Sequence, residues 1–361
     1  MSIRKKISWV LWPVTMWYAV VVVLRNLLFE LGIIKQTISP VTTIGIGNIA
    51  AGGTGKTPMT DYLLGLFSER FATAVVSRGY KRKSKGCVVT TDGQASVAEV
   101  GDEVAMLLAK HPNVPAAVCK KRTVAIDHLM ATENPPQLVI LDDVYQHRFL
   151  KPTINVLLTE YNRLYSDDYI LPFGNLREPR TASRRANVIV VTKSPRRLNL
   201  LEKHLIAERL KVQCYQKLFF SYIEYGEPVA LLDAPDVLLA DVRHALCVTG
   251  IANPSPLIDE LRAHGIKVDH LAFGDHHNFS GRDVAEIAKR FEALNSPSKI
   301  IITTEKDAAR LRDLVVGLPV YYLPMSIGFH DENGKNFPDY ITSMVKENIS
   351  FLTRLNEGCK C

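Results

Sequence analysis

The sequence predicts an α/β protein: a parallel sheet flanked by helices, a smaller second α/β domain and an apolar amino-terminal helix. Three observations predict this fold. Residues 41–58 give a buried strand, a glycine-rich turn and the start of a helix. Apolar strands then alternate with helical segments through residue 192, as expected when helices cover both faces of a parallel sheet. The aromatic, extended segment 214–225 separates this alternation from a second, shorter one.

The composition favours an anionic partner. The chain has 361 residues and a formal net charge of +7, which suits a nucleic acid, an acidic membrane surface or a phosphorylated substrate. Its six cysteines lie scattered, without the spacing of zinc ligands. A reduced, cytoplasmic compartment is therefore the simplest expectation.

Residues 1–37 predict a membrane-associated helical segment. No charged residue occurs from Ile7 to Leu24, tryptophans and a tyrosine are interspersed, and Pro13 interrupts the run. Eighteen uncharged residues are marginal for spanning a bilayer, whereas the aromatic content suits a membrane–water interface. We expect a helix that dips into one leaflet. A transmembrane span and a buried core helix are the alternatives.

The turn at residues 52–57 predicts a phosphate-binding loop, or P-loop. Its glycines let the backbone amides curl around a phosphate, and the helix that follows offers its positive end to the same anion. Lys56 would reach the β- and γ-phosphates, and the Thr57 hydroxyl would bind Mg²⁺. The pattern expects glycine at position 50, where the chain has Ala50. The predicted nucleotide-binding residues are Gly52, Gly53, Thr54, Gly55, Lys56 and Thr57.

Polar residues follow the next strands at their carboxyl ends, where open α/β sheets place ligands. The strand 72–77 ends in a polar cluster that includes Arg78 and Tyr80, and the strand 114–118 is followed by Arg122. The buried strand 136–141 ends in an acidic pair, the arrangement that supports Mg²⁺ directly or through water. The predicted metal ligands are Thr57, Asp142 and Asp143, and a strand-end cap is the alternative for Asp143.

The remaining segments complete the domain plan. Strands at 155–158 and 187–192 extend the first sheet, and the loop 171–179 carries Arg177 and Glu178. We expect Arg177 to clamp phosphate charge and Glu178 to be a further metal candidate. The predicted P-loop kinase domain spans 38–213, the second α/β domain with its linker strands spans 214–330, and 331–361 return to the first domain.

Seven motifs occur in one order along the chain: Gly-Gly-Thr-Gly-Lys-Thr-Pro, Ser-Arg-Gly-Tyr, Gly-Asp-Glu, Leu-Asp-Asp-X-aromatic-Gln-His, Leu-Arg-Glu-Pro, Asp-His-His and Thr-Thr-Glu-Lys-Asp. Together they resemble the tetraacyldisaccharide 4′-kinase family over nearly the whole chain. One departure is Val144, where the family usually has glycine.

The resemblance implies an ATP- and Mg²⁺-dependent kinase. Its acceptor would be the 4′-hydroxyl of the tetraacyldisaccharide 1-phosphate precursor of lipid A, at the cytoplasmic face of a Gram-negative inner membrane. The implied partners are this anionic acylated disaccharide and the membrane surface, with no nucleic acid. The implied fold is two α/β/α domains joined by a two-strand linker, with catalysis in the cleft. The implied substrate-binding residues are Arg78, Tyr80, Arg122, Gln146 and His147.

The resemblance also places Asp102 and His276 on the cleft. We expect Asp102 to face the acceptor hydroxyl with His276 as its partner, and an exchange of these two roles is the alternative. Lys56 and Arg177 complete the expected catalytic set. His277 is the other candidate for the histidine role, and the non-catalytic alternative is that Asp102 caps its helix.

Two other functions stay open. One is a membrane-associated P-loop GTPase or ATPase switch acting on a protein partner, since Thr304–Asp307 superficially resembles a guanine-specificity motif, although that motif starts with Asn. The other is a non-catalytic nucleotide sensor.

Overall fold

The chain forms two compact units. The computed structural model describes residues 8–80, 82–91, 95–251, 253–275, 277–331 and 336–358. One unit comprises Met1–Tyr222 with Ile327–Cys361, and the other comprises Ile223–Ser326. The sequence-based boundaries, 214 and 330, differ from these because strand β10 (Lys217–Tyr225) begins as part of the first unit's sheet, where it pairs with β9 (Val188–Thr192).

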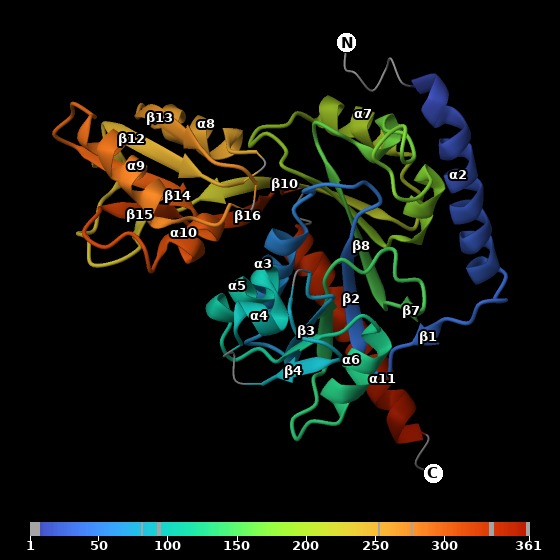
Figure 1. The fold of residues 1–361 in the computed structure, drawn as a ribbon. Helices are drawn as coiled ribbons and strands as arrows, with labels where there is room; N and C mark the ends of the chain where they lie inside the picture. Colours follow the sequence, from blue (N-terminus) through green and yellow to red (C-terminus); the bar gives the residue numbers. More distant parts are fainter. Residues whose placement is uncertain are drawn as a thin grey trace. The chain divides into compact units, whose positions relative to one another are not determined.

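The first unit is built on a sheet that, within the described residues, has nine strands in the order β16-β10-β9-β8-β2-β6-β3-β5-β4 (Figure 1). The strands from β10 to β5 pair in parallel, and β4 is antiparallel to β5 at the edge. A separate pair joins β1 to β7 in parallel. The bounds are β1 Thr37–Ile38, β2 Thr42–Gly47, β3 Thr73–Ser77, β4 Val88–Thr90, β5 Ala116–Val118, β6 Leu138–Leu141, β7 Leu150–Lys151, β8 Ile154–Glu160 and β16 Met325–Phe329.

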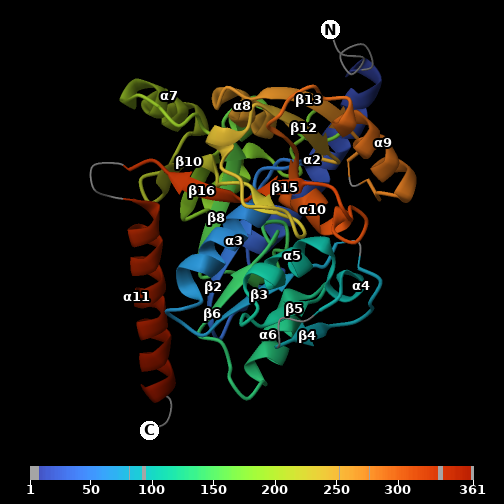
Figure 2. The same ribbon diagram turned by 90° about the vertical axis from the view of Figure 1, so that its left-hand side faces the viewer.

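Alternating side chains of this sheet face two helical layers. Val188 and Val190 of β9 belong to one apolar cluster, whereas Ile189 and Val191 belong to another, as the period of two in a strand requires. The first layer contains α3 (Lys56–Phe67), α5 (Asp102–Lys110) and α11 (Phe337–Gly358), as Figure 2 shows. The second contains α6 (Arg122–Met130) and α7 (Leu200–Leu210). The short helix α4 (Val97–Val100) precedes α5.

The second unit has its own sheet of five strands among the described residues, in the order β11-β15-β14-β12-β13. All neighbours pair in parallel except β11 with β15. The bounds are β11 Val229–Ala230, β12 His244–Thr249, β13 Lys267–Ala272, β14 Lys299–Thr304, β15 Val320–Leu323, α8 Ser255–Ala263, α9 Gly281–Glu292 and α10 Glu305–Leu311.

Two strands connect the units. The chain enters the second unit through β10 and returns through β16, which is its neighbour in the sheet. His330 N donates to Phe220 O and Gly226 N donates to Pro324 O, so the two strands run antiparallel. The returning chain ends in α11, whose Phe337, Ile341 and Val345 are fully buried in the first unit.

The amino-terminal helix α2 (Ser8–Glu30) exposes most of the apolar side chains described in it, which begin at Trp12. Its portion Trp12–Glu30 is long and apolar enough to cross a membrane by length and composition, and 17% of that stretch is buried in the protein. This exposure argues against the alternative of a buried core helix, because a core helix hides its apolar side chains from water. Trp17, for example, is 71% exposed.

Candidate active site

The glycine-rich turn forms a loop between β2 and α3, at the carboxyl end of the central strand. Gly52 and Gly55 have positive φ angles of 117° and 84°, a region that side chains with a Cβ rarely adopt. Gly55 immediately precedes Lys56, the first residue of α3. The amino end of α3 therefore meets the loop, as anion binding requires.

Three side chains tether this loop from outside. Thr192 Oγ1 donates to Thr54 O at 2.9 Å, Lys193 Nζ donates to Gly53 O at 2.7 Å, and Asn48 Nδ2 donates to Thr54 Oγ1 at 2.7 Å. Sequence reasoning missed all three residues. A signal existed for Thr192 and Lys193, because they stand at the carboxyl end of a predicted strand, the same rule that located Asp142.

The departure at Ala50 has a structural explanation. Ala50 forms an antiparallel β-bridge with Leu176, flanked by hydrogen bonds from Ala51 N to Asn175 O and from Arg177 N to Ile49 O, both 2.7 Å. This extended pairing suits alanine, and the positive φ angles fall later, at Gly52 and Gly55. The same pairing attaches Arg177 to the loop.

The acidic pair lies against the loop and its lysine. Asp143 Oδ1 is 3.7 Å from Lys56 Nζ, and Asp143 Oδ2 is 3.8 Å from Arg177 Nη1. Asp142 is 2% exposed and accepts a hydrogen bond from Thr60 Oγ1 at 3.2 Å. Burial raises the pKa of Asp142 to about 7, and the neighbouring carboxylates of Glu103 and Asp143 add to the rise. A site with these properties attracts a cation.

The donor set fits Mg²⁺. Asp143 Oδ1 is a buried oxygen without a hydrogen-bond partner among the described residues. Thr57, whose hydroxyl is the other predicted ligand, is the second residue of α3, directly after Lys56. In the described part of the chain, no group of three or more His, Cys, Asp or Glu could hold a metal ion. Mg²⁺ is commonly bound by one or two carboxylates together with substrate phosphates, and Asp142 and Asp143 could supply the carboxylates.

Glu178 does not support the predicted metal role. It is 1% exposed, and its two carboxylate oxygens accept from Arg185 Nη1 at 2.8 Å and Nη2 at 3.1 Å. Asn26 Nδ2 of α2 also donates to it, at 3.0 Å. A carboxylate already paired with a guanidinium and an amide is a structural anchor. The sequence could not reveal this, since nothing in it pairs Glu178 with Arg185.

Arg122 is likewise a support. It is 3% exposed, and its guanidinium donates to the carbonyls of Cys119, Lys120 and Asp143 at 3.3–3.4 Å. This burial speaks against direct contact with a substrate, and the bond to Asp143 O stabilises a residue with a positive φ of 45°. Arg122 therefore shapes the acidic turn.

The other predicted substrate residues differ in exposure. Arg78 and Tyr80 are exposed at the end of β3. Gln146 Nε2 donates to Asn48 O at 2.7 Å, so the amide braces the phosphate loop. Burial lowers the pKa of His147 to about 4, with the positive charge of Arg122 as the next cause and smaller contributions from Arg25 and Arg78.

The structure places one member of the predicted catalytic pair. Asp102 is the first residue of α5, after Gly101, which occupies the N-cap with a φ of 89°. His276 lies outside the described residues. His277 stacks on Phe273, with ring centroids 4.8 Å apart, and its Nε2 is 3.1 Å from an oxygen of Asp283. The pairing of Asp102 with His276 stays a prediction.

Asp307 closes the Thr-Thr-Glu-Lys-Asp motif and is fully buried in the second unit. It accepts from Gly250 N and from Thr304 Oγ1, each at 2.8 Å, and Arg310 lies 3.3 Å away. Asp307 therefore joins the end of β12 to the start of α10.

Comparisons with known proteins agree over nearly the whole chain. The family model for tetraacyldisaccharide-1-P 4′-kinase matches residues 7–344. The tetraacyldisaccharide 4′-kinase of Bacteroides fragilis is 40% identical and aligns over 94% of this chain and 93% of its own. That of Flavobacterium johnsoniae is 39% identical and aligns over 97% and 99%. The crystal structure of LpxK from Aquifex aeolicus in complex with ATP matches with a TM-score of 0.72 at 26% identity, covering 95% of this chain and all of that one. The chain therefore belongs to the tetraacyldisaccharide-1-P 4′-kinase family.

Proposed function

We propose that this chain is an ATP-dependent kinase that phosphorylates the 4′-hydroxyl of the tetraacyldisaccharide 1-phosphate precursor of lipid A. The observation that carries the proposal is the tethered loop 52–57, whose Lys56 lies beside the acidic pair Asp142 and Asp143. The family match of this chain spans residues 7–344. This loop supplies the amides and the cation that a transferring phosphoryl group needs.

Each charged residue has a distinct task in this proposal. Lys56 and Arg177 stabilise charge on the transferring phosphoryl group, because both approach Asp143 at the loop. Thr57, Asp142 and Asp143 would hold Mg²⁺, which neutralises phosphate charge when bound. Glu178 and Arg122 belong to the supporting structure.

We assign the proton acceptor to Asp102 with His276 as its partner. The packing of the second unit favours this choice of histidine, because the ring of His277 already stacks on Phe273 and binds Asp283. The Asp102 carboxylate would accept the proton of the acceptor hydroxyl, and the imidazole of His276 would orient that carboxylate.

The acceptor is an acylated lipid, and α2 supports its delivery from a membrane. Nine large apolar side chains between Trp12 and Leu27 are at least 45% exposed. We assign the enzyme to the cytoplasmic face of the inner membrane, held there by α2. Arg78, Tyr80, Gln146 and His147 are the proposed substrate contacts near the phosphate loop.

The rival function as a guanine-nucleotide switch loses its main support. In a guanine-specificity motif the acidic side chain must face the base, whereas Asp307 is fully buried and holds Gly250 N. The motif Thr304–Asp307 is therefore structural.

The test is a transfer assay with γ-labelled ATP, Mg²⁺ and the tetraacyldisaccharide 1-phosphate in mixed micelles. Label in the lipid at the 4′ position supports the kinase, and label in free phosphate alone would contradict it. We expect Lys56→Ala to lower kcat about 10²–10³-fold, the usual cost of removing a preorganised charge donor. Lys346→Ala, on an exposed turn of α11, is the matched control and should retain full activity.

A further inference from the structure

Helix α2 carries one buried face of mostly polar residues. Tyr18, Val22, Arg25, Asn26 and Phe29 recur at the spacing i, i+4, i+7, i+8 and i+11, which places them on one side of a helix. Val22, Asn26 and Phe29 are 9%, 6% and 4% exposed. We call these five residues the polar seam. A lipid anchor has no need of such a seam, so its contacts call for an explanation.

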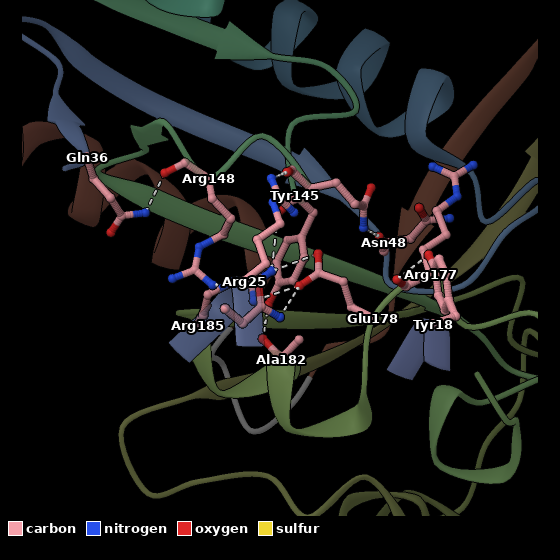
Figure 3. A network of polar contacts seen from close by, with 12 residues as sticks. Tyr18, Arg25, Gln36, Asn48, Tyr145, Arg148, Arg177, Glu178, Ala182 and Arg185 are labelled. Carbon is pink, nitrogen blue, oxygen red and sulfur yellow. Dashed lines mark hydrogen bonds and ion pairs between the residues drawn. The ribbon is translucent and has the colours of Figure 1, made fainter. Parts of the chain in front are cut away.

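Asn26 lies at the centre of the seam. Its Nδ2 donates to Glu178 at 3.0 Å and its Oδ1 accepts from Arg148 Nη1 at 3.2 Å, so both ends of the amide are engaged. Figure 3 shows Glu178, Arg185 and Arg148 within one network of polar contacts. The amide thus joins the loop after β6 to the loop that carries Arg177.

A first chain of hydrogen bonds runs from the seam to the phosphate loop. Arg25 Nη2 donates to Gln146 O at 3.1 Å. The Gln146 side chain donates to Asn48 O at 2.7 Å, and Asn48 Nδ2 donates to Thr54 Oγ1 at 2.7 Å. Figure 3 shows Arg25 and Asn48 within this one network. Hydrogen bonds therefore connect Arg25 of α2 to Thr54 through two intermediate residues, Gln146 and Asn48.

A second chain reaches the same site through Arg177. Tyr18 OH donates to Arg177 O at 3.0 Å, and Arg177 Nη1 lies 3.8 Å from Asp143, the acid that also faces Lys56. Because Glu178 follows Arg177 directly, Tyr18 and Asn26 hold two successive residues of this loop. Both routes lie entirely within the first unit.

We propose that Tyr18, Arg25 and Asn26 are positioning residues for nucleotide binding, so that α2 builds the phosphate site as well as contacting lipid. Buried hydrogen bonds in one connected network act cooperatively, and removing one partner leaves the others unsatisfied. The inference rests on the proposed nucleotide site at 52–57 and not on the identity of the phosphoryl acceptor.

The test measures nucleotide affinity directly. Full-length protein in detergent micelles is titrated with a fluorescent, non-hydrolysable ATP analogue and Mg²⁺, for the unchanged chain and for Asn26→Leu, Arg25→Met and Tyr18→Phe. We expect Asn26→Leu and Arg25→Met to weaken binding about tenfold, and Tyr18→Phe about threefold, as for lost hydrogen bonds that are buried at Asn26 and partly buried at Arg25 and Tyr18. Asn26→Leu makes α2 more apolar, so membrane partition is retained while nucleotide affinity falls.

Asn348→Leu is the matched control. Asn348 lies in α11, and its amide donates to Met344 O in the same helix at 2.8 Å, so this substitution should leave nucleotide affinity unchanged. In the transfer assay, the three substitutions on α2 should raise the KM for ATP and leave the KM for lipid unchanged. A merely structural role would lower the melting temperature without this split.

A double-mutant cycle tests the route. Arg25→Met and Gln146→Leu interrupt the same chain, so their combined loss should equal the larger single loss. Losses that multiply, or folded variants whose nucleotide affinity stays within twofold of the unchanged chain, would overturn the inference. If Asn26→Leu does not fold, Tyr18→Phe carries the test, since it removes one hydroxyl. Failure of the unchanged chain to bind the analogue would instead overturn the proposed function.

Discussion

Helices α2 and α11 stand at opposite ends of the chain and attach to the same unit in opposite ways. Helix α11 buries apolar side chains, with Phe337, Ile341 and Val345 each 0% exposed. Helix α2 attaches through its polar seam and turns residues such as Trp17 and Leu24 outward, 71% and 53% exposed. The pattern of α11 is that of a helix folded in water. The pattern of α2 is that of a helix whose outer face meets an apolar solvent.

The two patterns indicate which interactions hold each helix in place. Apolar burial contributes about 25 cal/mol per Å², and this term stabilises α11. Helix α2 is held by the hydrogen bonds of its polar seam, whose net contribution is about 1 kcal/mol each in water, together with the packing of Val22 and Phe29. We therefore expect the two helices to respond to opposite changes in sequence. Groups near them, His147 near Arg25 of α2 and Tyr62 near Asp339 of α11, should respond to opposite ends of the pH scale.

The largest difference should appear on truncating an apolar side chain. Ile341→Ala should lower the free energy of unfolding by about 2–5 kcal/mol, because it opens a cavity in a fully buried layer. Leu24→Ala on α2 should change it by less than about 0.5 kcal/mol. Urea unfolding in detergent measures both. Equal losses at the two positions would mean that α2 packs like a core helix.

The next effect reverses the comparison. Trp17→Ala should weaken binding to vesicles of anionic phospholipid about tenfold, since a tryptophan at the interface buries a large apolar area. Phe351→Ala is the control, because Phe351 is 59% exposed on α11 and should make no membrane contact. Sedimentation with vesicles measures both. Equal weakening by Phe351→Ala would extend the membrane surface to α11.

A smaller effect concerns acid. Burial lowers the pKa of His147 from 6.5 to about 4, with the charge of Arg122 as the next cause and a smaller contribution from Arg25 of α2. The folded chain therefore takes up a proton at His147 less readily than the unfolded chain. This contribution to stability is complete above pH 6.5 and is lost as the pH falls through 4, because the unfolded chain takes up a proton first. His147→Gln should flatten this part of the curve of unfolding free energy against pH. An unchanged slope would show that His147 is solvated.

The smallest effect lies in alkali and concerns Tyr62 of α3, whose ring centroid is 6.2 Å from that of Phe337 of α11. Burial, with the Asp339 charge of α11 as the next cause, raises the pKa of Tyr62 from 10.0 to about 12. The folded chain holds this proton longer than the unfolded chain. Stability is therefore complete below pH 10 and is lost as the pH rises through 12. Tyr62→Phe should remove this loss in the same titration, and a loss that persists would assign it to another group.

The strand ends were predictable from the sequence, and most side-chain partners were not. Periodicity located β2 and β6, and the rule that ligands bind at carboxyl ends pointed to residues 52–57 and to the acidic pair. The fate of Glu178 depends on Arg185 and Asn26, which share no pattern with it. The burial of Arg122 depends on how the turn at Asp143 folds. These contacts arise from tertiary packing, which local patterns do not encode.

The polar seam is an intermediate case. Its spacing is visible in the sequence once the face is known, yet the flanking residues are apolar all round, and periodicity cannot show which face meets the protein. Arg25 and Asn26 were the usable signal, since polar residues inside an apolar helix need partners. The choice between His276 and His277 could not be made from the sequence for a similar reason, because two adjacent residues give no sign of which ring packs against the protein.

The tethered phosphate loop also bears on the conformational entropy of nucleotide binding. Fixing one residue of a mobile backbone costs about 1–2 kcal/mol, and a loop that orders only around its ligand loses that much affinity at every residue. Here Lys193, Thr192 and Asn48 hold the loop through its own carbonyl and hydroxyl groups, and the bridge at Ala50 fixes its entry. The ordering cost is met when the chain folds. We therefore expect that little of the free energy of nucleotide binding is lost in ordering the loop around the phosphates.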